Sequence, residues 1–168
     1  HHRGVLLIPL KTPLQPGEAE TLTIRYSGEA LFALDQDCYW VVNTWPWYPM
    51  NGFHDRTRFA ATVHHPAHLR MAGTGTTVSA EEADGVRTER WEETVPVHFP
   101  SMIIGNFTTV EEGVTPSGVK IRAFFTPAEE QHAGEAIGET MRVIQFYEDL
   151  YGPFPFAEVD VAEMRVNM

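Results

Sequence analysis

The sequence predicts a mainly β protein: an antiparallel β-sandwich or saddle that ends in one long helix and a further strand. Short runs of β-branched and aromatic residues recur at intervals of about ten residues. Turn signals such as Asn51-Gly52 and Asp84-Gly85 separate these runs. A run with helical periodicity follows near the C-terminus, which places the helix after the sheets.

The first strands are predicted at residues 5–10 and 20–26, on either side of a segment rich in proline and glycine. The second run alternates Leu22, Ile24 and Tyr26 with polar residues, which is the period of a half-buried strand. The same criteria predict further strands at residues 39–42, 58–64, 69–72, 76–80, 87–93, 102–111, 119–125 and 158–164.

The helix is predicted over residues 128–151. Thr126 is the expected N-cap, Pro127 suits the first turn, and Gly152 with Pro153 ends the helix. Its apolar positions are expected to form one broad face, wider than a single sheet edge can cover, so a following domain is expected to supply a partner surface. These positions are Ile137, Met141, Val143, Ile144, Phe146, Tyr147 and Leu150.

Composition excludes several classes of function. The chain has 12 basic and 23 acidic residues, a formal net charge of -11, and no cluster of Lys and Arg. Nucleic-acid binding is therefore not expected, because phosphate contacts need clustered positive charge. The sequence contains no run of about 18 apolar residues, so no transmembrane segment is predicted in it. The single Cys38 is compatible with any compartment.

Four segments carry a family resemblance: Tyr26-Ser27-Gly28, residues 100–107, residues 118–122, and the helix end with its two prolines at 146–156. In this order they resemble the N-terminal domain of the gluzincin metallopeptidases related to aminopeptidase N and leukotriene hydrolase. The resemblance implies a β-saddle domain over residues 1–126. It also implies that residues 127–168 form the helix and strand that open a thermolysin-like catalytic domain.

The resemblance further implies a function for the parent protein, which is zinc-dependent removal of N-terminal residues from peptides. The family's His-Glu-x-x-His zinc motif does not occur in this chain, so no catalytic or metal-ligating residue is assigned here, and zinc is expected only in the parent. The expected role is to brace the downstream catalytic domain and to wall its active-site cleft. The alternative is a free-standing β-sandwich module that binds peptide or carbohydrate.

Asn43, Thr44 and Trp45 are the candidate substrate-binding residues, because the resemblance places this region near the mouth of the family's active site. The surrounding aromatic side chains form either a ligand platform or a cap on the core. This aromatic group consists of Tyr39, Trp40, Trp45, Trp47, Tyr48 and Phe53.

Two other groups suggest ligands less strongly. Adjacent residues of a strand point to opposite faces, so His64 and His65 are expected to be surface or edge histidines rather than metal ligands. The acidic residues lack the spacing of a calcium loop and are expected to be solvated. They are Glu81, Glu82, Asp84, Glu92 and Glu93.

Overall fold

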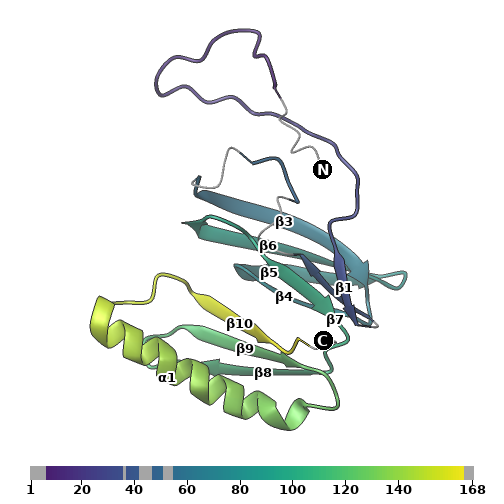
Figure 1. The fold of residues 1–168 in the computed structure, drawn as a ribbon, viewed down its shortest axis with the longest axis vertical. Helices are drawn as coiled ribbons and strands as arrows, with labels where there is room; N and C mark the ends of the chain where they lie inside the picture. Colours follow the sequence, from purple (N-terminus) through teal and green to yellow (C-terminus); the bar gives the residue numbers. More distant parts are fainter. Residues whose placement is uncertain (1–6, 36, 42–46, 51–54, 165–168) are drawn as a thin grey trace.

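The computed structural model describes residues 7–35, 37–41, 47–50 and 55–164, and it confirms the predicted fold class. Strands account for 42% of the chain and helix for 15%, and the one long helix precedes a final strand. Figure 1 shows the strands gathered into stacked sheets with the helix along one side. No helix among these residues has the length and apolar character needed to span a bilayer.

The strands form three sheets. The central sheet is antiparallel and has the order β1 (Phe32–Asp35), β2 (Cys38–Val41), β7 (Met102–Gly105), β4 (Arg70–Gly73). The outer sheet is antiparallel and has the order β3 (Thr57–Pro66), β6 (Val86–Val97), β5 (Thr76–Ala83). The junction sheet has the order β10 (Glu158–Ala162), β9 (Lys120–Phe125), β8 (Thr109–Val114).

The central sheet is covered on both faces. Met71 and Ile104 pack with Trp91 of the outer sheet in one buried cluster. Their neighbours Ala72 and Ile103 belong to a second cluster, with Phe124 of the junction sheet. Successive residues of a strand point to opposite faces of the sheet, so neighbouring apolar residues in β4 and β7 are buried in two different cores. A strand buried on both faces reads as a continuous apolar run, as residues 102–104 do.

The junction sheet is built around a crossover. Strand β9 is followed by a short 3-10 helix (Glu130–His132) and by α1 (Ala133–Tyr151), and β10 then pairs with β9 in parallel. Helix α1 packs on one face of this sheet (Figure 1). The buried core between them comprises Val119, Ile121, Ala123, Phe125, Ala133, Ile137 and Ile144. Strands β8 and β9 therefore share a sheet and a core with the helix, although the domain division after residue 126 stays a prediction.

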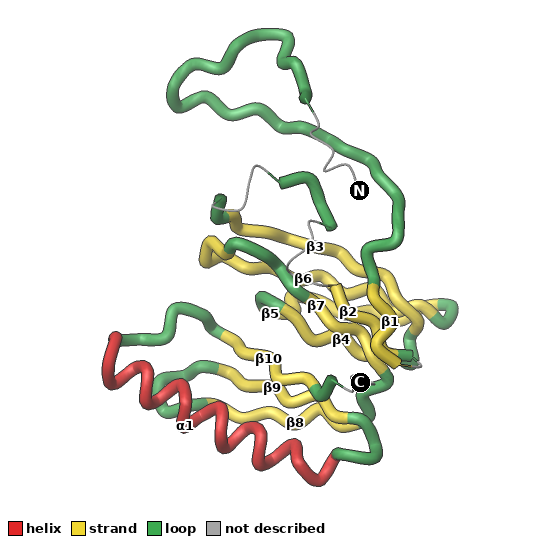
Figure 2. The backbone as a smooth tube through the Cα atoms, in the orientation of Figure 1, coloured by secondary structure: helices red, strands yellow, loops and turns green. Residues whose placement is uncertain are grey.

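Three strand predictions are corrected. Residues 7–31 contain no strand, and Figure 2 shows this segment as a loop that extends away from the sheets. Leu22 and Tyr26 are exposed, so the alternation there has no sheet to pack on. The run predicted at 102–111 is two strands, because the chain leaves the central sheet at Gly105 and enters the junction sheet at Thr109. Strand β1 was not predicted.

The helix start also differs from the prediction. Helix α1 begins at Ala133, after the 3-10 turn, and its N-cap His132 makes no capping hydrogen bond through its side chain. Thr126 is not the N-cap. Its hydroxyl and backbone N–H both donate to the Glu163 carboxylate, at 2.6 and 3.0 Å, and so tie the end of β9 to the chain after β10. A long-range acceptor therefore replaces the local cap.

Gly113 sets the distance between α1 and β8. A Cβ atom there would lie 2.5 Å from Cγ2 of Ile137 and 2.7 Å from Cε of Met141. Gly113→Ala is therefore expected to lower the free energy of unfolding by about 1 to 3 kcal/mol in urea titrations. The matched control is Gly138→Ala in the helix, where a Cβ meets nothing within 4 Å and should add up to about 1 kcal/mol. Equal effects of the two substitutions would contradict a contact-limited spacing.

Candidate functional site

A cleft of about 370 Å³ lies between the edge of the central sheet and strand β10. Its apolar wall includes three aromatic residues, Trp40 from β2 and Phe154 and Phe156 from the turn before β10. Glu93, Glu158 and Asp160 also line it. The cleft thus combines flat apolar rings with an acidic wall.

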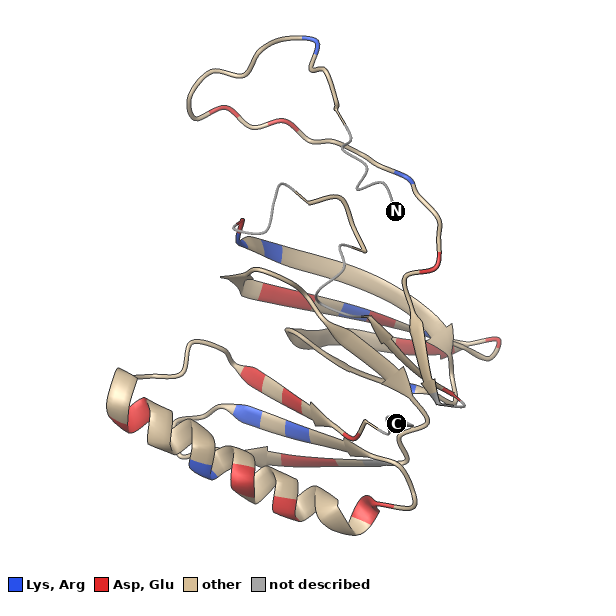
Figure 3. Cartoon of the chain, viewed as in Figure 1, with Lys and Arg blue, Asp and Glu red and all other residues tan. Residues whose placement is uncertain are grey.

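Arg122 is the cation at this junction. Strands β9 and β10 pair in register, so that Asp160 lies opposite Arg122 and Glu158 opposite Lys120. Figure 3 shows this arrangement as basic segments on β9 beside acidic segments on β10. Arg122 donates to both carboxylate oxygens of Asp160, at 2.9 and 2.8 Å, and its Nη2 lies 2.7 Å from Oε1 of Glu158. The guanidinium of Arg122 therefore forms ion pairs with two carboxylates.

The same ion pair connects all three sheets. Arg122 Nη1 donates to Thr77 Oγ1 of the outer sheet at 3.3 Å, and its guanidinium lies 5.1 Å from the ring centroids of both Trp91 and Phe124. Asp160 accepts a 2.8 Å hydrogen bond from the backbone N–H of Gly73 in the central sheet. Guanidinium groups stack on aromatic faces and donate within their plane, so both contacts are favourable at once.

Burial makes Glu158 and Asp160 harder to ionise. Desolvation raises the pKa of Glu158, Arg122 opposes that rise, and the charge of Asp160 adds to it. Burial likewise raises the pKa of Asp160 against the hydrogen bonds from Arg122. Glu93 was predicted to be solvated, but it is 8% exposed and accepts a 2.7 Å hydrogen bond from the backbone N–H of Val95. Three carboxyl groups, those of Glu93, Glu158 and Asp160, thus line the cleft.

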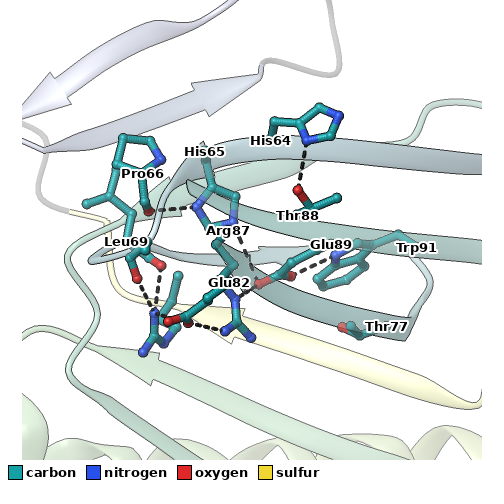
Figure 4. Close-up of polar contacts among 12 residues, drawn as sticks. His64, His65, Pro66, Leu69, Thr77, Glu82, Arg87, Thr88, Glu89 and Trp91 are labelled. Carbon is teal, nitrogen blue, oxygen red and sulfur yellow. Dashed lines mark hydrogen bonds and ion pairs between the residues drawn. The ribbon is translucent and has the colours of Figure 1, made fainter. Parts of the chain in front are cut away.

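A second polar network lies in the outer sheet (Figure 4). His65 was predicted to be a surface or edge histidine, and it lies on edge strand β3 with its ring buried. Its Nδ1 donates to the carbonyl of Pro66 at 3.0 Å, and its Nε2 lies 3.6 Å from Oε1 of Glu89. Glu89 also accepts from Trp91 Nε1 at 2.9 Å and from Nε of Arg87. Both carboxylate oxygens of Glu89 thus accept a hydrogen bond, whereas the buried His65 Nε2 has no hydrogen-bond partner.

The predicted site residues Asn43, Thr44 and Trp45 lie outside the described residues. They follow directly on β2, whose Trp40 lines the cleft. The charged cleft residues were not predicted from the sequence, although the two-residue spacing of Arg122 with Lys120, and of Asp160 with Glu158, was a usable signal. It predicts charges on one face of each strand, but not that the two strands pair.

The described members of the aromatic group support packing more than a platform. Tyr39 packs against the core between the central and outer sheets, and Trp40 against the core facing the junction sheet. Trp47 donates from Nε1 to the carbonyl of Pro100 at 3.2 Å and meets Tyr48 edge to face at 5.0 Å. Trp45 and Phe53 lie outside the described residues.

Comparisons with known proteins give a likeness in fold. No family model and no curated protein matches the sequence. Among solved structures, an M1 zinc metallopeptidase from Deinococcus radiodurans matches with a TM-score of 0.61 and 24% identity, over 79% of this chain and 33% of that one. A mutant of a two-domain M1 zinc metallopeptidase, bound to L-arginine, matches with a TM-score of 0.63 and 23% identity, over 78% and 33% of the two chains.

The chain thus has the fold of the N-terminal part of these metallopeptidases and spans about a third of the length of the solved structures it matches. Within the described residues, no group of three or more His, Cys, Asp or Glu side chains is placed to hold a metal ion. The carboxylates of the cleft are bound to Arg122 and to backbone N–H groups, and they do not form a metal-ligand set.

Loss of Arg122 is expected to destabilise the fold strongly. Arg122→Met keeps much of the side-chain volume but leaves the buried Asp160 without its ion-pair partner and Glu158 with only Lys120 at 4.0 Å, which should lower the free energy of unfolding by about 3 to 5 kcal/mol. The matched control is Arg142→Met, because Arg142 pairs with Glu139 on the helix surface and should change stability by only a few tenths, about 0.5 kcal/mol at most. Urea titrations compare the two, and similar losses would contradict the assigned role.

The raised pKa of Glu158 predicts a pH-dependent effect. A carboxyl group whose pKa is higher in the folded chain contributes stability below its unfolded pKa and loses it as the pH rises through the folded pKa. The Tm of the unmodified chain should therefore fall relative to that of Glu158→Gln as the pH rises above about 4.3, the ordinary pKa of a Glu side chain. Glu81→Gln, at an exposed position on β5, should show no such trend. A Tm difference for Glu158→Gln that stays constant with pH would exclude this effect.

Proposed function

We propose that this chain is the non-catalytic N-terminal part of a zinc-dependent aminopeptidase-like protein. The observation that carries the proposal is the structural likeness to M1 zinc metallopeptidases, which covers 78–79% of this chain. The chain spans about a third of those proteins, so the parent's activity belongs to sequence beyond it. Its role is to brace the zinc-bearing domain and to wall one side of the substrate cleft.

The bracing role is supported by the packing at the junction. The central sheet is packed on both faces, and the ion pair of Arg122 and Asp160 joins it to the junction sheet and the outer sheet. A rigid support is what a catalytic site requires, because small displacements of reacting groups lower the rate strongly. We therefore assign the junction sheet the role of fixing the next domain against the first.

The wall role concerns the cleft and the residues that follow β2. We propose that Asn43, Thr44 and Trp45 lie beside a bound peptide substrate in the parent protein. Zinc is held by chain outside these 168 residues, because the His-Glu-x-x-His motif is missing from the sequence. The metal would activate water for peptide hydrolysis there, and this chain would orient the peptide and restrict its access.

The second candidate function is a free-standing binding module for peptide or carbohydrate. It is favoured by one observation, the presence of Trp40, Phe154 and Phe156 in a cleft of about 370 Å³. Ring faces of this kind stack on sugars and on flat peptide groups. This candidate predicts that the chain binds its ligand alone, without any further domain.

The test compares the 168-residue chain with a form extended beyond Met168 by the sequence that follows in its gene. We expect about one zinc per chain and hydrolysis of aminoacyl-anilides only in the extended form. Asn43→Ala in that form should raise KM several-fold with little change in kcat, because a residue beside the substrate contributes binding. The control is Asn106→Ala, which changes an exposed residue away from the cleft.

Two results would oppose the proposal. An extended form without zinc or hydrolysis would exclude the peptidase assignment. Binding of oligosaccharides or peptides by the 168-residue chain alone, measured by calorimetry and lost in Trp40→Ala, would favour the binding module instead.

A further inference from the structure

Glu93 is a buried carboxylate that lines the cleft without a cationic partner. The residue is 8% exposed, and its Oε1 accepts a 2.7 Å hydrogen bond from the backbone N–H of Val95. In the part of the chain that the structure describes, Oε2 of Glu93 has no hydrogen-bond or ion-pair partner. Buried carboxylates are normally paired with positive charge, so this oxygen favours a cation in the cleft.

Glu158 gives the cleft a second free acceptor, on strand β10. Its Oε1 is 2.7 Å from Nη2 of Arg122, whereas its Oε2 lies 4.0 Å from Nζ of Lys120, beyond hydrogen-bond distance. Both oxygens of Asp160 already accept hydrogen bonds, from Arg122 and from the backbone N–H of Gly73. The free acceptors of the cleft carboxylates therefore lie on two strands, β6 and β10.

Hydrogen-bond donors on the central-sheet side of the cleft are bonded within the chain. The N–H of Thr74 donates to the carbonyl of Ser101 at 2.9 Å, and the N–H of Ser101 donates to the Thr74 hydroxyl at 3.1 Å. The Ser101 hydroxyl donates to the carbonyl of Val41 at 3.3 Å. A ligand that brings donors thus finds free acceptors, whereas a carboxylate or phosphate finds these donors occupied.

Aromatic rings form part of the apolar wall. Trp40, Phe154 and Phe156 line the cleft and are half-buried, and the two Phe rings meet edge to face with centroids 5.5 Å apart. Such rings attract cations and also pack against the aliphatic stems of basic side chains. The volume of about 370 Å³ is at the low end for ligand sites, which span about 300 to 1,000 Å³. It fits one long side chain that ends in a cation.

We propose that the cleft is a subsite for the basic side chain of a peptide, whose guanidinium or ammonium group donates to Glu93 and Glu158. The aliphatic stem of that side chain packs against the aromatic rings. This inference deepens the proposed function and rests on it, since a peptide is the ligand proposed for the parent protein. Glu93 is then the residue that distinguishes a charged side chain from a neutral one.

The experiment titrates the 168-residue chain with N-acetyl-arginine methylamide, followed by NMR. The matched neutral probe is N-acetyl-citrulline methylamide, which has a urea group in place of the guanidinium. Both probes have blocked termini, so neither an α-amine nor an α-carboxylate contributes. The arginine probe should bind about tenfold more tightly, because charge-assisted hydrogen bonds are the stronger ones. Its shift changes should centre on the backbone amides of residues 73–75 and on the indole N–H of Trp40.

Glu93→Gln tests the residue assigned to specificity. Gln keeps an oxygen for the N–H of Val95 but removes the negative charge. The arginine probe should therefore lose about tenfold in affinity, while the citrulline probe changes little. Glu81→Gln is the matched control, because it removes the same charge at an exposed position on β5 and should change neither affinity. Thermal melts followed by circular dichroism check that both variants are folded.

Three results would overturn the subsite: equal affinities for the two probes, shift changes away from the cleft, or a folded Glu93→Gln that binds the arginine probe normally. Binding of the arginine probe to the short chain but not to the form extended beyond Met168 would overturn the substrate role, because the following sequence would then fill the cleft. An extended form that binds the arginine probe but contains no zinc would support the subsite and would exclude only the peptidase assignment.

Discussion

The ion pair between Arg122 and Asp160 is the constraint on which the arrangement of the three sheets depends. The two carboxylates that contact Arg122, those of Asp160 and Glu158, are desolvated, and desolvation alone would favour their protonated forms. The pairing persists because the guanidinium lies 5.1 Å from the ring centroids of both Trp91 and Phe124 and contacts both carboxylates. Buried ion pairs seldom add much net stability compared with apolar packing, but they tolerate few alternative geometries. Here the consequence is a fixed register between β9 and β10.

That register could not be obtained from local sequence patterns. The alternation of strands, the turn residues and the helix were sufficient to predict most strands of the central and outer sheets, because those signals depend on residues close in sequence. The pairing of β9 with β10 spans the whole helix, so the contact of Arg122 with Asp160 was not foreseen. For the same reason Glu93 was expected to be solvated, although the fold buries it beside the cleft.

The failures have a common physical origin, which is that a strand or cap is defined by its partner. Residues 20–26 have the alternation of a half-buried strand, but no described strand pairs with them. Residues 102–111 were predicted as one strand although Gly105 and Asn106 interrupt the run, and the structure places the two halves in two different sheets. Thr126 has the chemistry of an N-cap, yet the Glu163 carboxylate offers its hydroxyl and N–H a stronger, charged acceptor.

The cleft owes its shape to the same long-range contacts. Gly75, which lines it, has a φ of +96°, and a Cβ atom there would lie 2.6 Å from the carbonyl oxygen of Glu92. The backbone can approach the outer sheet this closely only because residue 75 lacks a side chain. Two residues earlier, the N–H of Gly73 is bound to Asp160. The edge of the central sheet is therefore fixed by two contacts: the close approach of Gly75 to Glu92, and the hydrogen bond from Gly73 to Asp160. Movement of the acidic wall would break one of these two contacts.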